Sequence, residues 1–317
     1  MKAILTGITG NLGFELSSYL LAKGMEIVPC LRPGHRDFLS SLPSAFDTLI
    51  ESDLVTQDLE FSGQVNAIIH CAGIVHFQKA ANQNALMMEK VIKLAKKLAV
   101  PVYYISTAFA YRPAGALKFN NAYELDKYNS EQLLIDSHVP QAIFRPSVLT
   151  GHTRTGAIRN FSGYYQIVRA FLTAIGAAQS KGKSLRFPIM GGVSDVLPVD
   201  QAASYIGQAI LERCLEKLFI TNPEPPSSNW TLEETLNFFG LRDKIELLHL
   251  SFEEYDNLDL SPEEAGLSKF AKHFNPYWSR KEIFPETIVQ KNLVNHEYMR
   301  RVLTFYRDSP TIYDHKK

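Results

Sequence analysis

A glycine-rich turn close to the first residue constrains the fold of this chain more than any other feature. Residues 1–5 form a short apolar run, and the string Thr6-Gly7-Ile8-Thr9-Gly10-Asn11-Leu12-Gly13 follows at once. A strand that enters a G-x-x-G-x-x-G turn and then a helix forms a cradle for phosphate. The glycines bring backbone N–H groups to the charge, and the helix adds its dipole. The residues predicted to contact a bound dinucleotide here are Thr6, Gly7, Thr9, Gly10, Asn11, Leu12 and Gly13.

The overall composition is that of an ordinary globular protein. The 317 residues carry no net charge at pH 7, with 45% hydrophobic and 21% charged residues. We therefore expect no electrostatic attraction to nucleic acid or to an anionic membrane. No apolar run approaches the ~18 residues that a membrane-spanning helix needs, and we expect no signal peptide ahead of the glycines.

The cysteines indicate a reducing compartment. Cys30, Cys71 and Cys214 are odd in number and scattered along the chain. This pattern argues against disulfide bonds and against a zinc site. We therefore expect a cytoplasmic protein that holds no metal.

Strand and helix patterns alternate along the first half of the chain. Strands are predicted at residues 3–6, 26–31, 49–51, 67–71, 102–105 and 141–144. Helices are predicted at residues 14–23, 84–98 and 123–137. This alternation predicts an α/β fold with a doubly wound parallel sheet.

The rhythm changes after residue 151. A loop and a helix are predicted within residues 154–178, a strand end and helix within 196–212, and a strand at 218–221. The remainder reads as mostly helical, with one strand at 245–250. We expect this part to form a smaller, mostly helical substrate-binding lid over the sheet.

Two side chains near the strand ends bear on the nucleotide. Arg32 ends the second strand, where an acidic residue would bind a free 2′-hydroxyl and an arginine accommodates a 2′-phosphate. The sequence therefore favours NADP over NAD, and His35 and Arg36 follow closely. Asp53 follows the third strand and could accept a hydrogen bond from the adenine amine. The alternatives are a solvated surface arginine and a carboxylate that caps a turn.

Small residues follow the fourth strand in the string His70-Cys71-Ala72-Gly73. Cys71, Ala72 and Gly73 would let the middle of the cofactor lie against the backbone. His70 sits on a buried strand, and we assign it to packing and hydrogen bonding. His76 lies a little beyond, and we interpret it as a surface loop histidine.

The strongest catalytic signal is Tyr123-Glu124-Leu125-Asp126-Lys127. A spacing of four residues puts Tyr123 and Lys127 on one face of a helix, one turn apart. We expect the neighbouring ammonium, and a cationic nicotinamide, to lower the pKa of the phenol and make it a usable proton donor. The fifth strand ends nearby in Ser106 and Thr107, at the sheet edge where such folds bind ligands.

Together these motifs resemble an extended short-chain dehydrogenase/reductase over about residues 1–225. The motifs are Thr6-Gly7-x-x-Gly10-x-x-Gly13, Asp53-Leu54, His70-Cys71-Ala72-Gly73, Asn84, Ser106-Thr107-Ala108, Tyr123-x-x-x-Lys127 and Arg145-Pro146-Ser147-Val148. Further strings resemble the thioester-reductase and fatty-acyl-reductase branch with its male-sterility-like domain. They are Tyr104-Ile105-Ser106-Thr107-Ala108, Arg145-Pro146-Ser147-Val148-Leu149-Thr150-Gly151, Thr153-Arg154-Thr155-Gly156 and Leu197-Pro198-Val199-Asp200.

The resemblance implies a role for each matching residue. Thr107 would bind the substrate carbonyl, Tyr123 would donate the proton, and Lys127 would bind the cofactor ribose. Asn84 would support the active-site helix. The implied cofactor contacts outside the first turn are Arg32, Asp53, Leu54, Cys71, Ala72, Gly73, Tyr123, Lys127, Pro146, Ser147 and Val148. Asn11 departs from the pattern, because an aromatic residue is usual at that place.

The resemblance implies an NADPH-dependent reductase with a Rossmann fold that transfers hydride to a carbonyl. The favoured substrate is an acyl thioester, small or carrier-tethered, reduced to an aldehyde or an alcohol, with a separate acyl carrier protein as the possible partner. Reduction of an aldehyde or ketone, and epimerisation or dehydration of a nucleotide sugar, stay open on the same scaffold. A non-catalytic protein that senses NADP is the alternative from another class. Residues 1–152 and 195–223 would form the NADP-binding domain, and residues 153–194 and 224–317 the lid.

Overall fold

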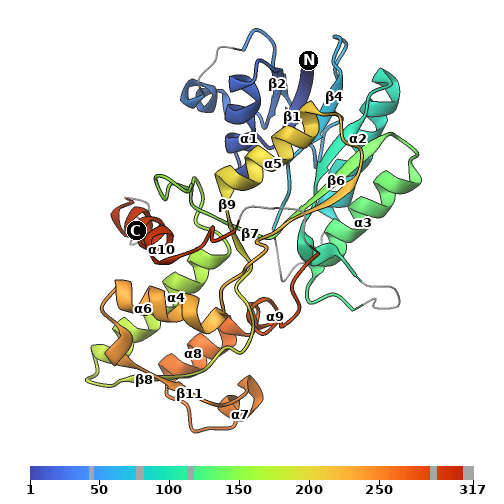
Figure 1. Cartoon of the computed structure of the whole chain (residues 1–317). Coiled ribbons are helices and arrows are strands. Elements are labelled where there is room, and N and C mark those ends of the chain that lie inside the picture. The colour runs from blue at the N-terminus through green and yellow to red at the C-terminus, as the bar shows by residue number, and fades with distance from the viewer. Residues whose placement is uncertain (43–45, 76–81, 113–117, 286–290, 310–317) are drawn as a thin grey trace. The chain divides into compact units, whose positions relative to one another are not determined.

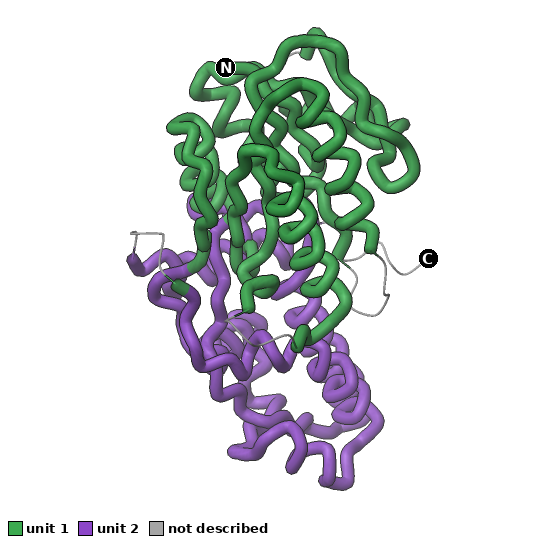
Figure 2. The backbone as a smooth tube through the Cα atoms, turned by 90° about the vertical axis from the view of Figure 1, so that its right-hand side faces the viewer, with its two compact units in different colours: residues 1–149, 199–221, 285–288 green, residues 150–198, 222–284, 289–317 purple. Residues whose placement is uncertain are grey.

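The computed structural model describes residues 1–42, 46–75, 82–112, 118–285 and 291–309. The chain divides into two compact units, coloured separately in Figure 2. Unit 1 comprises Met1–Leu149, Val199–Thr221 and Pro285–Ile288, and unit 2 comprises Thr150–Pro198, Asn222–Phe284 and Val289–Lys317. The assignment of NADP binding to one part of the chain and of a substrate lid to the other stays a prediction.

Unit 1 is built on a seven-stranded parallel sheet with the order β10-β6-β5-β4-β1-β2-β3 (Figure 1). Its strands are β1 (Lys2–Thr6), β2 (Glu26–Leu31), β3 (Ile50–Glu51), β4 (Ala67–His70), β5 (Val102–Ile105), β6 (Gln141–Pro146) and β10 (Lys217–Ile220). Thr6 pairs with Cys30 on one side and with His70 on the other. The carboxyl ends of β1, β2 and β4 therefore lie side by side, and the segments that follow them meet at one edge.

Helices cover the sheet of unit 1 in two pairs. They are α1 (Asn11–Ala22), α2 (Gln83–Leu98), α3 (Ala122–Asp136) and α5 (Val199–Leu211), with short 3-10 turns η1 (Arg36–Ser41) and η2 (Ala108–Ala110). α1 packs on α5 and α2 packs on α3. Met88 and Val91 of α2 belong to a core cluster with Ile4, Ile68 and Tyr104, so this pair buries the sheet face that these strand residues share.

The α1–α5 pair owes its close approach to a glycine. A Cβ atom built on Gly207 of α5 would lie 2.4 Å from the ring of Tyr19 on α1. A larger residue at position 207 would therefore have to displace the Tyr19 side chain. The same pair buries Leu16 and Leu20 of α1 and Ile206 of α5.

Unit 2 is mostly helical. It contains α4 (Tyr164–Gln179), α6 (Ser228–Phe238), α7 (Phe252–Asp256), α8 (Pro262–Ala271), α9 (Asn275–Trp278), α10 (His296–Asp308) and the 3-10 turn η3 (Arg242–Lys244). Strands β8 (Leu185–Pro188) and β11 (Ile245–Leu248) form a parallel pair. Two further strands, β7 (Val148–Thr150) and β9 (Val196–Pro198), lie near the unit boundaries in the sequence.

The predicted elements agree closely with the observed ones in unit 1, and the fold class is confirmed. The strands predicted at 26–31 and 102–105 have the observed bounds, and the others differ by a residue or two at an end. The sequence analysis missed β7 and β8. Both are three or four residues long, and β8 is completed only by β11, some sixty residues later in the chain.

Candidate active site

The turn between β1 and α1 has the geometry of a phosphate cradle. Gly7 has a φ of 71°, and a Cβ atom there would lie 2.4 Å from the backbone nitrogen of Ala72. A Cβ atom on Gly13 would lie 2.1 Å from the carbonyl oxygen of Gly7. α1 then begins with Gly10 as its cap and no acidic residue in its first turn, so no carboxylate of that turn offsets the dipole.

Thr6 joins this turn to the end of β4. Its hydroxyl lies 2.7 Å from Nδ1 of His70 and accepts a hydrogen bond from the backbone N–H of Ala72 at 3.3 Å. Burial lowers the pKa of His70 to about 3, and the charge of Lys127 adds to the shift. His70 therefore stays neutral and serves packing and hydrogen bonding, as the sequence indicated.

Lys127 lies beneath the same edge of the sheet. It is buried, its amine donates a hydrogen bond to the Ile105 carbonyl at 2.9 Å, and a Cβ atom on Gly73 would lie 3.1 Å from its Nζ. Burial lowers the pKa of Lys127 from 10.5 to about 8, against the opposing effect of Cys71, Asp126 and other acidic groups. The structure thus brings together α3 and the small residues that follow β4.

Tyr123 lies one turn before Lys127 in α3, and its side chain is partly buried. The expectation that its pKa would be lowered is wrong for this structure. Burial raises the pKa of Tyr123 well above its ordinary value, and the charges of Glu124 and Asp126 raise it further. Desolvation and the two buried carboxylates act against the effect expected from the ammonium, and the spacing of Tyr123 and Lys127 reveals neither of them.

Thr107 follows β5 at the same edge. Its side chain is buried, its hydroxyl lies 3.5 Å from the Pro146 carbonyl oxygen, and it accepts a hydrogen bond from the Phe109 N–H at 3.4 Å. The Ser147 N–H donates to the carbonyl oxygen of Ile220. Among the described residues the Ser147 hydroxyl is buried without a hydrogen-bond partner. Thr107, Pro146 and Ser147 therefore gather where β5 and β6 end.

The sequence analysis missed the position of Asp126. This buried carboxylate accepts hydrogen bonds from the Asn84 side chain at 2.8 Å and from the backbone N–H groups of Asn84 and Ala85 at 2.9 and 3.1 Å. It therefore caps the N-terminus of α2, where the helix dipole favours negative charge. Asn84 in turn exchanges two hydrogen bonds with the backbone of Ile74. An acidic residue between Tyr123 and Lys127 is visible in the sequence. The sequence does not reveal that it binds Asn84, because Asn84 lies 42 residues earlier in the chain.

The two predicted adenosine contacts differ in their surroundings. Arg32 is exposed at the end of β2, and its side chain has no ion-pair partner within the described ranges. An acid does stand on the next strand, because Glu51 pairs with Leu31 in the sheet, but it forms an ion pair with Arg36 at 2.6 Å. Asp53 accepts a hydrogen bond from the Val55 N–H, which is the turn interpretation left open above.

The other predicted residues are placed more simply. Leu54 is buried in the core cluster, and its contact with a cofactor stays a prediction. Burial raises the pKa of the Cys71 thiol to about 12, so Cys71 is a small, uncharged residue of the site. Val148 is half-buried in β7. His76 lies outside the described residues.

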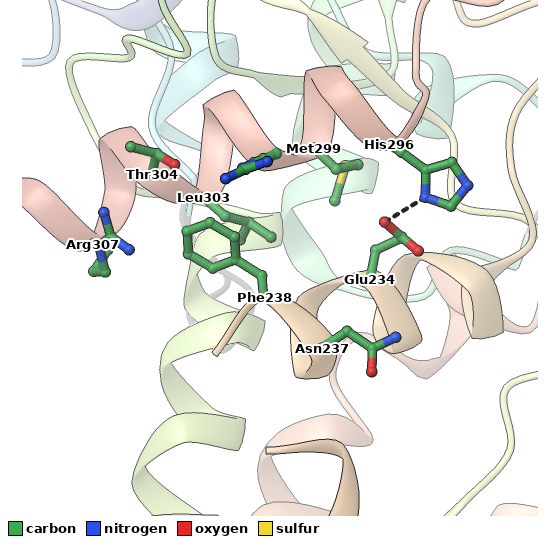
Figure 3. Close-up of a pocket in the computed structure, with 9 residues that line it drawn as sticks. Glu234, Asn237, Phe238, His296, Met299, Leu303, Thr304 and Arg307 are labelled. Carbon is green, nitrogen blue, oxygen red and sulfur yellow. Dashed lines mark hydrogen bonds and ion pairs between the residues drawn. The ribbon is translucent and has the colours of Figure 1, made fainter. Parts of the chain in front are cut away.

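Unit 2 contains a groove of about 600 Å³ between α6 and α10 (Figure 3). Phe238 and Met299 lie in it, with Arg300 and Arg307 along α10 and a hydrogen bond of 2.7 Å between His296 and Glu234 at one end. None of the predicted site residues lines it.

Neither a metal site nor a membrane-spanning helix is found among the described residues. Across those ranges, no group of three or more His, Cys, Asp or Glu side chains is placed to hold a metal. No helix within them has the length and apolar character needed to cross a membrane.

Comparisons with known proteins bear on the fold of the chain and on the family it resembles. The family model described as male sterility protein, an NAD-binding family, matches residues 53–206. The hybrid PKS-NRPS synthetase xenE of Xenoacremonium sinensis is 26% identical over 254 residues, which cover 70% of this chain. The chain spans only 6% of the length of that relative.

Solved structures share the fold. The terminal R domain of the myxalamid PKS-NRPS pathway superposes with a TM-score of 0.73 at 19% identity, covering 97% of this chain and 91% of that one. The UDP-glucose 4-epimerase of Thermus thermophilus, solved with NAD, superposes with a TM-score of 0.60 at 15% identity, covering 98% and 100%. Residues 53–206 thus match the NAD-binding male sterility protein family, and the whole chain shares the Rossmann fold of the R domain and of the NAD-bound epimerase.

Proposed function

We propose that this chain is an NADPH-dependent reductase that transfers hydride to the carbonyl carbon of an acyl thioester. The observation that carries the proposal is the meeting of three features at one edge of the sheet in unit 1. These are the glycine turn after β1, the Gly73 backbone against the Lys127 amine, and the Thr107 hydroxyl after β5. The first product is an aldehyde, and a second hydride transfer would give an alcohol.

The residues present fit a nicotinamide dinucleotide. The turn at Gly7 and Gly13 leaves no room for side chains, as a backbone that must approach a pyrophosphate requires. The buried Ser147 hydroxyl has no partner among the described residues, so it is free to bond a group such as the nicotinamide carboxamide of a bound cofactor. When bound, the cofactor supplies the hydride.

The charges of two arginines favour the binding of NADPH over that of NADH. Arg32 is exposed and without an ion-pair partner within the described ranges, and Arg36 neutralises Glu51, the acid on the neighbouring strand. A 2′-phosphate would form charge-assisted hydrogen bonds with the Arg32 guanidinium.

Side chains of this protein would supply the proton to the substrate carbonyl oxygen. The raised pKa of Tyr123 keeps its phenol protonated at neutral pH, which is the form that an acid catalyst needs. Tyr123 would give its proton to the carbonyl oxygen, or stabilise it by hydrogen bonding while a thiolate leaves. Thr107 would hold the same oxygen. Lys127 has one N–H donor committed to Ile105, and two remain for the ribose hydroxyls.

The thioester class is supported by the relatives and by the loop that follows β7. The matched relatives include a PKS-NRPS synthetase and the terminal R domain of another such pathway. Thr153-Arg154-Thr155-Gly156 resembles the corresponding string of thioester reductases. We infer that the acyl group reaches this chain on a phosphopantetheine arm, carried by an acyl carrier protein or by a small thiol. The three free cysteines further support a reducing, cytoplasmic setting.

The direct test is NADPH oxidation against a panel of S-acyl pantetheines, aldehydes, ketones and nucleotide sugars. The proposal expects oxidation with the thioesters. Turnover of aldehydes or ketones alone would leave the carbonyl-reductase alternative. Interconversion of nucleotide sugars without net NADPH loss would assign the chain to the epimerases that share its fold.

A further inference from the structure

Tyr104 contacts both the Lys127 amine and His70, and it has no role in the site described above. Lys127 Nζ lies 4.8 Å from the centroid of the Tyr104 ring. The Tyr104 ring stacks on His70, with centroids 5.6 Å apart and an interplanar angle of 18°. His70 is bound to Thr6 of the glycine turn. A continuous set of contacts therefore runs from the phosphate cradle to the amine.

We propose that Tyr104 is a positioning residue that holds the Lys127 ammonium against its ring face, and that this contact keeps the amine charged and aimed at the cofactor ribose. The ring centroid lies within the ~6 Å at which an ammonium is attracted by an aromatic face. The amine is buried, so water does not screen the attraction. The part that concerns ribose rests on the proposed function, whereas the effect on the charge of Lys127 does not.

The proposed role of Tyr104 depends on its ring, which contacts the Lys127 amine, and not on its hydroxyl. The side chain is completely buried, and its hydroxyl forms no hydrogen bond of good geometry in the described part of the chain, although Ser130 lies close to it. Removing the hydroxyl therefore breaks no hydrogen bond to Lys127, whereas removing the ring removes the contact. Phe is accordingly the matched control at position 104.

The contact matters because Lys127 is poised between two charge states. Burial already lowers the pKa of Lys127 to about 8, so a modest further decrease in that pKa would deprotonate much of the amine near neutral pH. The titratable groups that face it are His70 of β4, Cys71 directly after that strand, Tyr104 of β5, and Asp126 and Glu131 of α3. With the pKa of His70 lowered to about 3 and that of Cys71 raised to about 12, neither changes charge between pH 6 and 10.

The test measures the pKa of Lys127 without cofactor or substrate. Parent, Tyr104→Phe and Tyr104→Leu proteins are labelled with trace acetic anhydride from pH 6 to 11, and the acetylation of Lys127 is read by peptide mass spectrometry. Tyr104→Leu should lower the pKa of Lys127 by about one unit, since a desolvated cation–π contact corresponds to a shift of that order. Tyr104→Phe should match the parent.

A second series keeps the volume of the ring, in case leucine disturbs folding. Phenylalanine with one or three fluorine atoms at position 104 preserves shape while withdrawing electrons from the ring face. The pKa of Lys127 should fall stepwise along the series, and the pH above which NADP⁺ binding is lost should fall with it. An unchanged or rising pKa along the folded series would overturn the role of Tyr104. Falling pKa values in a protein that binds no NADP⁺ would uphold the contact and refute the proposed function.

Discussion

Replacing Lys127 by methionine should make the protein more stable at pH 7 while removing its capacity to bind the cofactor tightly. The Lys127 ammonium is buried, and its pKa falls from 10.5 to about 8. A buried charge whose pKa is depressed opposes folding, because the unfolded chain solvates it better. Methionine keeps the apolar stem and removes the charge.

The magnitude follows from the shift. A difference of about 2.5 pKa units corresponds to about 3 kcal/mol at 1.36 kcal/mol per unit. Loss of the hydrogen bond to Ile105 costs roughly 1 kcal/mol, so Lys127→Met should gain about 2 kcal/mol at pH 7. Between pH 8 and 10.5 the unfolded parent binds more protons than the folded parent, so parent stability rises with pH in this window. By pH 10 the advantage of the variant should shrink by about 2 kcal/mol.

Urea unfolding of both proteins at pH 7, 8, 9 and 10 measures this difference. Lys97→Met, at an exposed position of α2, controls for the loss of a lysine as such. Calorimetry with NADP⁺ on the same samples should show weaker binding to Lys127→Met. A stability difference that stays constant from pH 7 to 10 would refute the depressed pKa and the reasoning built on it.

Three further predictions concern the proton donor, the nucleotide and the helix cap. Tyr123→Phe should lower turnover by roughly 10²–10⁴ with cofactor affinity unchanged, and near-parental turnover would remove Tyr123 from the mechanism. Arg32→Asp should weaken NADPH binding by roughly 10- to 100-fold and NADH binding little, measured by calorimetry; equal parental affinity for both cofactors would contradict this. Asp126→Asn should lower the free energy of unfolding by about 2 kcal/mol, because its amide would face the α2 donors, and an unchanged urea midpoint would count against the cap.

The sheet of unit 1 could be predicted because each of its strands is marked locally. β2 and β5 are apolar runs bounded by turn residues, and the glycines after β1 define the first crossover. The short strand β8 is defined by its partner β11, so its own four residues carry no such signal.

The candidate site could be predicted in its residues and only partly in its electrostatics. Tyr123 and Lys127 are predicted from their spacing, which places them one turn apart on a helix, and from the position of that helix after the fifth strand. The raised pKa of Tyr123 depends on burial, which the spacing does not reveal. The cap that Asp126 forms on α2 and the ring of Tyr104 at Lys127 both depend on packing between elements that are separate in the sequence.

The release of thiol during NADPH oxidation with an S-acyl pantetheine distinguishes a thioester reductase from a reductase of aldehydes or ketones. Absorbance at the NADPH wavelength and a thiol reagent would be followed in the same sample, with Tyr123→Phe as the inactive control. A thioester reductase should consume one NADPH per thiol released when the product is the aldehyde, and two when it is the alcohol. NADPH oxidation by simple aldehydes or ketones with no detectable thiol from any thioester would contradict the thioester-reductase function.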